Sequence, residues 1–94
     1  MAKPILRAEY DAVRSLIREL RIGAEVKQVD LSEALGKPQP YISAIETGHR
    51  RVDIVEIRDI CKALDLTLSD FVTKLEKAIR SPAKKVRAKR TRVG

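Results

Sequence analysis

Hydrophobic residues recur along the first third of the chain at the spacing of two amphipathic helices. A stripe at positions i, i+3, i+4 and i+7 predicts one helix over residues 7–24. A shorter stripe predicts a second helix that begins near Lys27 and stops at Gly36, because glycine readily takes a left-handed conformation. Gly23 weakens the last turn of the first helix by about 1 kcal/mol relative to Ala. The stripe residues are Val13, Leu16, Ile17, Leu20, Leu31 and Leu35.

The segment GKPQPYISAIETG, residues 36–48, predicts a third short helix with two prolines at its head. This helix is expected to begin at Pro38 or Gln39 and to end at Thr47, with Gly48 as its stop signal. Prolines are tolerated in a first helical turn because the amide hydrogens they lack would have no intrahelical acceptor. The second proline is Pro40, and the apolar stripe consists of Ile42 and Ile45.

Two further helices are predicted in the second half of the chain. Asp53 is the expected N-cap of the fourth helix, and Thr67 or Ser69 that of the fifth. The fifth has more apolar positions than one side of a three-turn helix needs, so part of it is expected to meet a second subunit. The predicted fold class is therefore all-α with five helices. The apolar positions are Ile54, Ile57, Ile60, Cys61 and Leu64, then Phe71, Val72, Leu75 and Ile79.

Charge separates the chain into a neutral domain and a basic tail. The 94 residues carry 20 Lys/Arg and 13 Asp/Glu, a net charge of +7. We expect a leader at 1–6, one domain at 7–79, and a tail at 80–94 that is disordered when unbound. The tail lacks acids and apolar anchors, so its expected partner is nucleic acid rather than membrane. Its basic residues are Arg80, Lys84, Lys85, Arg87, Lys89, Arg90 and Arg92.

Composition excludes several classes of protein. A single cysteine, Cys61, excludes an internal disulfide and fits a buried apolar position better than a reactive thiol. No apolar run approaches the roughly 18 residues of a membrane span, and the N-terminus lacks a signal-peptide core. We therefore expect a cytoplasmic protein. One histidine, no glycine-rich phosphate loop and no metal-ligand spacing argue against an enzyme and predict neither cofactor nor metal.

The second and third predicted helices form a helix-turn-helix. Their connection is short and begins with glycine, and the second helix of such a unit enters the DNA major groove by its N-terminal end. Prolines at that end keep the backbone stiff where side chains meet DNA. The segment KQVDLSEALGKPQPYISAIETGHRRVDIVEIRDICKALDL, residues 27–66, resembles the phage-repressor-like, Xre/Cro-type helix-turn-helix family.

The resemblance covers about residues 7–79. It implies a five-helix, lambda-repressor-like DNA-binding domain that is commonly dimeric and regulates transcription. The chain departs from the family pattern at several positions of the helix-turn-helix. These departures leave fewer side chains that can hydrogen-bond to bases, so part of the specificity is expected to come from DNA shape. These positions are Ser32 for the usual Ala, Lys37 in a turn position that is often apolar, Pro38 for a Ser or Thr cap, and Pro40 and Ala44 for longer polar residues.

Four residues are predicted to read bases. Gln39 can bond an adenine edge through both ends of its amide, a contact that contributes about 1–3 kcal/mol of discrimination. Pro40 and Ala44 could touch thymine methyl groups, and Ser43 could bond a base or a phosphate. The alternative for Ser43 and Ala44 is that they face solvent.

A second set of residues is predicted to contact phosphates. The resemblance implies that Gln28 bonds a phosphate and braces Gln39, the alternative being an ordinary exposed residue of the first turn. Lys37 and Tyr41 are further predicted phosphate contacts, although Tyr41 is about as often half-buried packing on a short helix.

The loop after Gly48 carries two more expected phosphate contacts, Arg50 and Arg51, because in the family it passes close to the DNA backbone. Arg51 could instead brace Asp53 or Glu56. His49 is expected to be a solvated loop residue, since no second His or Cys pairs with it.

Arg21 and Glu46 match the ion pair that joins the first and third helices in the family, so both are expected to be structural. In the tail, Lys84, Lys85, Arg87, Lys89, Arg90 and Arg92 are predicted to bind DNA without sequence preference.

These observations predict a sequence-specific transcriptional regulator, a repressor in its simplest form, that binds an inverted-repeat operator as a homodimer. Its two reading helices would then lie about 34 Å apart. An antitoxin that pairs with a small toxin and autoregulates its operon is the alternative. A general nucleic-acid binder led by the tail is a third possibility, and salt-resistant preference for one duplex would argue against it.

Overall fold

The computed structural model of the protein describes residues 8–80 and contains five α-helices, with no strand among these residues. The predicted all-α, five-helix fold is therefore confirmed. The predicted leader and the tail from residue 81 lie outside the described range. Arg80 lies inside α5, so the helical domain extends one residue beyond its predicted end. The helices are α1 (Ala8–Gly23), α2 (Gln28–Ala34), α3 (Tyr41–Glu46), α4 (Ile54–Ala63) and α5 (Leu68–Arg80).

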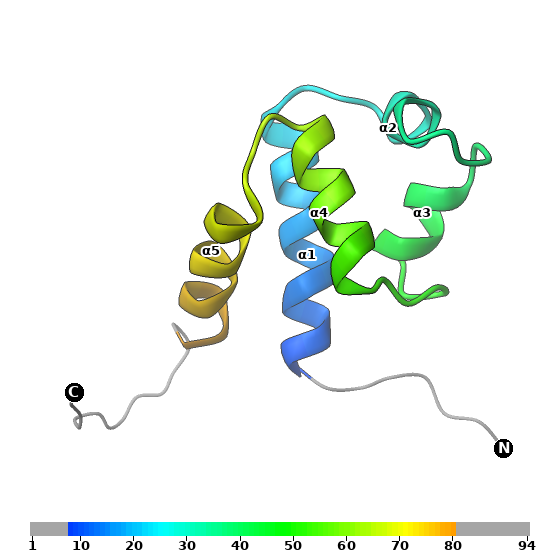
Figure 1. The fold of residues 1–94 in the computed structure, drawn as a ribbon. Coiled ribbons are helices and arrows are strands. Elements are labelled where there is room, and N and C mark those ends of the chain that lie inside the picture. Colours follow the sequence, from blue (N-terminus) through cyan, green and yellow to red (C-terminus); the bar gives the residue numbers. More distant parts are fainter. Residues whose placement is uncertain (1–7, 81–94) are drawn as a thin grey trace, which may run out of the picture.

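Helix α1 lies at the centre of the bundle and contacts both α3 and α5 (Figure 1). Helix α5 lies on one side of α1 and α3 on the other, while α4 contacts α2 and α5. Apolar side chains from all five helices form the buried core, as expected from the predicted apolar stripes. Its largest fully buried members are Phe71, Ile17, Leu31, Ile42, Ile45 and Ile60.

Four connections between helices turn through a left-handed residue. Gly36 and Gly48 take this conformation after α2 and α3, with φ of 69° and 85°. After α1 and α4, however, Glu25 and Asp65 adopt it, with φ of 61° and 64°. Gly23 is not the turning residue that ends α1, because the left-handed position falls two residues later. Each non-glycine residue adopts this conformation at a steric cost.

The predicted caps of the last two helices are present. Asp53 accepts a hydrogen bond from the Glu56 amide, and the Glu56 carboxylate accepts one from the Asp53 amide, which forms a capping box. For α5 the structure selects Thr67 rather than Ser69, because the Thr67 hydroxyl accepts from the Asp70 amide at 2.9 Å.

Some residues of the predicted apolar stripes lie at the surface. Ile54 is 61% exposed and its neighbour Val55 63% exposed, so the stripe of α4 is partly buried at Ile57 and fully buried only from Ile60. On α5, Val72 and Ile79 are also exposed. No helix within the described range is long and apolar enough to cross a membrane.

Candidate nucleic-acid interface

The turn before α3 holds both prolines and Gln39. The third helix does not begin at Pro38 or Gln39, as the pattern predicts, but at Tyr41. The Tyr41 amide donates to the Pro38 carbonyl at 3.0 Å, which closes a tight turn over the three preceding residues. Pro40 disfavours a helical conformation at Gln39, the residue before it, and this delays the start of the helix. Gln39 is therefore presented on an exposed turn at the tip of α3.

Helix α3 has no side-chain cap from its own N-cap residue, which is Pro40. The Ile42 amide instead donates to the Ser32 hydroxyl of α2 at 3.1 Å, and both residues are fully buried. An amide in the first turn of a helix has no intrahelical acceptor. Ser32, where the family usually has Ala, thus supplies from another helix the bond that Pro40 cannot make.

The predicted base-reading residues occupy the start and one face of α3. Gln39 and Pro40 are exposed, whereas Ser43 and Ala44 are half-buried on the helix itself. Pro40, Ser43 and Ala44 follow the i, i+3, i+4 spacing of one helical face. The structure therefore brings these residues to one surface, with Gln39 at its most exposed end.

Glu46, the last residue of α3, is the point where three helices meet. Arg21 of α1 donates from Nε to Glu46 Oε2 at 2.6 Å and from Nη2 to Oε1 at 3.0 Å. Both residues are buried, so this ion pair is well shielded from water. Gln28 at the start of α2 donates its amide to Glu46 Oε1 at 2.8 Å, rather than bracing Gln39. The Glu46 carboxylate thus ties α3 to both α1 and α2.

Two predicted phosphate contacts, Lys37 and Arg50, lie against the ring of a third, Tyr41. Lys37 Nζ lies 5.3 Å and the Arg50 guanidinium 4.8 Å from the centroid of the Tyr41 ring. Both distances are in the range of cation–π interactions. Tyr41 itself is only 8% exposed, which agrees with the alternative that this side chain packs against the rest of the domain. Burial, followed by the negative charge of Glu56, raises the pKa of its hydroxyl.

The loop between α3 and α4 is held by Glu56. Arg50 donates to both oxygens of the Glu56 carboxylate, at 2.9 Å from Nη2 and 3.3 Å from Nη1. The bond to Glu56 that was the alternative role for Arg51 is therefore made by Arg50. The Arg50 hydrogen bond, with the bond from the Asp53 amide, lowers the pKa of Glu56 from 4.5 to about 2. Glu56 consequently stays ionised and keeps Arg50 against Tyr41.

Arg51 lies on the other side of this loop. Its guanidinium is 6.0 Å from the centroid of the Tyr10 ring of α1, and the Tyr10 hydroxyl donates to the Arg50 carbonyl at 3.3 Å. His49 is exposed, and its Nδ1 lies 2.8 Å from the Thr47 hydroxyl. Arg51 remains exposed, so its guanidinium is accessible to a phosphate.

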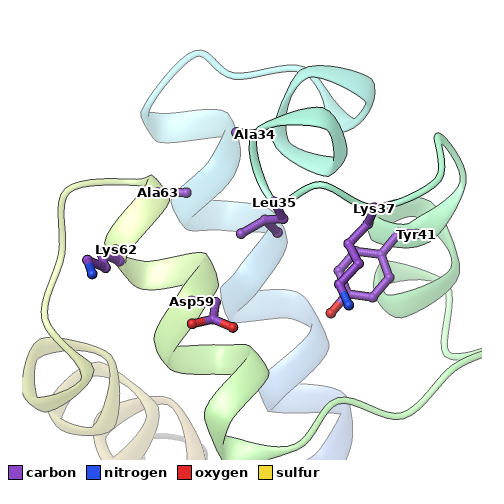
Figure 2. A pocket seen from close by; sticks show the side chains of 7 residues that line it. All are labelled: Ala34, Leu35, Lys37, Tyr41, Asp59, Lys62 and Ala63. Carbon is purple, nitrogen blue, oxygen red and sulfur yellow. The ribbon is translucent and has the colours of Figure 1, made fainter.

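An open cavity of about 350 Å³ lies between the helix-turn-helix and α4. Figure 2 shows Lys37 and Tyr41 side by side at one end of it and Lys62 at the other. Residues 8–80 contain no group of three or more His, Cys, Asp or Glu side chains arranged to hold a metal ion. Cys61 is buried in the core, which raises the pKa of its thiol.

The sequence alone does not indicate the roles of several residues in this arrangement. Ser32 is recognisable as a small residue at a close crossing, but its role as the hydrogen-bond acceptor for α3 is not. Glu56 signals a capping box through its spacing from Asp53, yet nothing local shows that it also binds Arg50. Arg14 and Tyr10 of α1 contact the end of α3 and the following loop across more than 30 residues of sequence.

The fold and the braced turn define a helix-turn-helix DNA-binding domain. The helix-turn-helix family profile matches residues 17–71, more than half of the chain. A solved XRE-family-like protein from Pseudomonas syringae pv. tomato is 35% identical, with a TM-score of 0.69, and the match covers 73% of this chain and 84% of that one. The chain therefore belongs to the Xre-type helix-turn-helix family of DNA-binding transcriptional regulators, which is not a class of enzymes.

Another similar structure is the restriction-modification controller protein C.Esp1396I. It is 27% identical, with a TM-score of 0.73, and the match covers 79% of this chain and 97% of the controller. The same controller has been solved as a tetramer in complex with its natural 35-base-pair operator, and that structure matches with 27% identity, a TM-score of 0.72 and the same coverage. A comparison with curated proteins finds no match.

Proposed function

We propose that this protein is a sequence-specific repressor that binds an inverted-repeat operator as a homodimer and reads bases with the turn and helix that begin at Gln39. The exposed Gln39 turn on a helix anchored to its neighbours is the observation that carries this proposal. Anchoring matters because a six-residue helix is too short to be stable alone. Gln39 bonds an adenine edge, while Pro40, Ser43 and Ala44 form the rest of the reading surface.

Phosphate contacts in this proposal flank the reading surface. Lys37 and Arg50 lie against the Tyr41 ring, and Arg51 is exposed in the following loop. Gln28 combines a phosphate contact with its bond to Glu46. The basic tail adds contacts without sequence preference, so its removal after residue 80 weakens binding to all duplexes about equally.

The reading surface is tested by selecting preferred sites from random duplexes and comparing the wild type with Gln39→Ala. The variant should lose about 1–3 kcal/mol of preference at one adenine of each half-site. Thr73→Ala, which truncates an exposed residue of α5, is the matched control and should select the same site as the wild type. Gln28→Ala is a poorer probe because it also removes a partner of the buried Glu46 carboxylate. Unchanged selection by Gln39→Ala would refute the assignment.

Dimerisation is proposed to use α5. Val72 and Ile79 are 42% and 37% exposed, and they lie seven residues apart on one face of the helix. Figure 1 places α5 on the side of α1 away from α3, so a partner bound there leaves the reading helix free. The similarity to C.Esp1396I, solved as a tetramer on its operator, supports a regulator that binds DNA as more than one copy.

Light scattering of Val72→Lys tests this interface. The wild type should be a dimer and Val72→Lys a folded monomer, because a buried lysine would lose its hydration without gaining a partner. Val55→Lys, at an equally apolar exposed position on α4, is the matched control and should remain dimeric. Dissociation by Val55→Lys alone would move the interface to α4. A wild type that instead forms a stable complex with a different small protein would favour the antitoxin function.

Repression follows most simply from occlusion of a promoter by the bound dimer. The test is transcription in vitro from a promoter that overlaps the selected site. Added protein should lower transcript yield from this template and leave a template with a scrambled site unchanged. A rise in yield would identify an activator.

A further inference from the structure

Arg14 of α1 contacts the main chain at the end of α3. Its Nη1 donates to the Glu46 carbonyl at 2.8 Å, and its Nη2 forms an ion pair with Asp11 Oδ1 at 2.6 Å. The Glu46 carbonyl is among the last four of α3, which have no amide partner within the helix. A cation at this end also interacts favourably with the helix dipole.

The Arg14 guanidinium also lies close to the main chain just after α3. A Cβ atom added to Gly48 would lie 3.3 Å from Arg14 Nε, so the main chain approaches Arg14 closely there. Gly48 also has a φ of 85°, which is strained for any side-chain-bearing residue. Arg14 therefore binds the last residue of α3 and lies beside Gly48, where the loop that carries Arg50 and Arg51 begins.

Two arginines of α1 thus bind the same residue of α3 in different ways. Arg14 and Arg21 are seven residues apart and lie on one face of α1. Arg21 binds the Glu46 side chain, and Arg14 binds its backbone carbonyl. A side-chain bond alone would allow the end of α3 to rotate about the Glu46 side-chain torsions, whereas the second bond fixes the main chain itself.

We propose that Arg14 is a positioning residue for base reading: it sets the orientation of α3 and its exit loop and does not touch DNA. This inference rests on the function proposed above. The Arg14 side chain is 25% exposed, against 41% for Arg50, and its guanidinium is bound to both Asp11 and the Glu46 carbonyl, so less of it is accessible to a phosphate. Its loss lowers the preference for the selected duplex, whereas the side chains proposed to contact phosphates, Lys37, Arg50 and Arg51, all remain present.

The test compares Arg14→Ala, Arg14→Lys and the control Arg18→Ala, which removes an exposed cation one turn along the same helix. Affinity is measured for the duplex that the wild type selects and for a random duplex, across a series of salt concentrations. Arg14→Ala should lose about tenfold in affinity for the selected duplex, the scale of one hydrogen bond from a charged donor. The salt dependence should match that of Arg18→Ala, and affinity for random DNA should fall less than affinity for the selected duplex. Arg14→Lys should recover most of the preference, because an ammonium can still donate to the Glu46 carbonyl.

Three results would overturn the inference. Equal weakening on both duplexes, with the slope of log affinity against log salt reduced by about 0.9, would make Arg14 a phosphate contact. An unchanged preference in a folded Arg14→Ala would remove any role in reading. If Arg14→Lys fails to recover the preference for the selected duplex, the hydrogen bond to the Glu46 carbonyl is not the cause of the loss. If Arg14→Ala does not fold, Asp11→Ala replaces it and should show a smaller loss of preference, and no loss would again contradict the inference.

Amide hydrogen exchange in the free protein separates this inference from the proposed function. The amides of His49 and Arg50 both donate to the Ala44 carbonyl, at 2.9 and 3.1 Å, and so report on the end of α3. They should exchange faster in Arg14→Ala, while the core amides of α5 should be unaffected. If the wild type selects no duplex, the proposed function fails, and the exchange rates still decide whether Arg14 anchors α3. Unchanged rates would refute the anchor.

Discussion

Replacing Glu46 with Gln tests whether α3 depends on its buried ion pair. The substitution preserves size but leaves the buried Arg21 guanidinium without a countercharge. Breaking a buried pair in this way costs about 3–5 kcal/mol. A domain of the 73 described residues is expected to have a total stability of about 4–11 kcal/mol, from roughly 0.05–0.15 kcal/mol per residue. Glu46→Gln should therefore remove at least about a quarter of the stability.

Urea denaturation followed by circular dichroism measures this loss. Asp59→Asn, which neutralises an exposed acid on α4, is the control and should change the free energy of unfolding by less than about 0.5 kcal/mol. The double variant Arg21→Met/Glu46→Leu should be less destabilised than the sum of its single changes, because it buries no lone charge. A cost for Glu46→Gln below about 1 kcal/mol, the range of exposed pairs, would refute the reasoning.

Three further substitutions probe other contacts. Ser32→Ala leaves the buried Ile42 amide without an acceptor and should lower the free energy of unfolding by about 1–3 kcal/mol; a change within error in urea denaturation would contradict the cap. Arg50 holds the folded-state pKa of Glu56 at about 2, below the ordinary 4.5, so this carboxylate stabilises fully above pH 4.5 and less as pH falls toward 2. Glu56→Gln should therefore be less stable at pH 7 and lose less stability between pH 4.5 and 2, and parallel pH curves would disprove the contribution. Asp65 has a left-handed φ of 64°, which glycine adopts without a steric penalty. Asp65→Gly should therefore raise the free energy of unfolding by about 1 kcal/mol, as measured by thermal denaturation. A decrease would show that the aspartate side chain itself stabilises the turn.

Local physics accounts for the features that the sequence predicts well. A helical stripe such as that of Leu16 and Ile17 repeats within one element, so its period is visible without knowledge of the partner helix. Caps such as Asp53 act within three residues and are equally visible. The prolines around Gln39 lie before the helix and not within it, because the restriction that Pro40 places on the preceding residue outweighs the tolerance of proline in a first turn.

Contacts between distant residues are less accessible to sequence reasoning. Arg50 and Arg51 are adjacent, chemically identical and both near Glu56, so the sequence could not show which of them would form the ion pair. In the structure it is Arg50 that forms the ion pair with Glu56. Its guanidinium also lies against the Tyr41 ring, which gives it a second favourable contact. Ile54 follows the helical period yet is exposed, since burial depends on which helices cover that turn.

The sequence by itself determined five helices and most of their apolar faces, because periodicity and caps act over a few residues. Only the tertiary structure decided how α3 is held. Ser32, Arg14 and Arg21 reach α3 from two other helices, between 10 and 32 residues away in sequence. Such bonds depend on the position of whole helices in space, and no local pattern encodes that position.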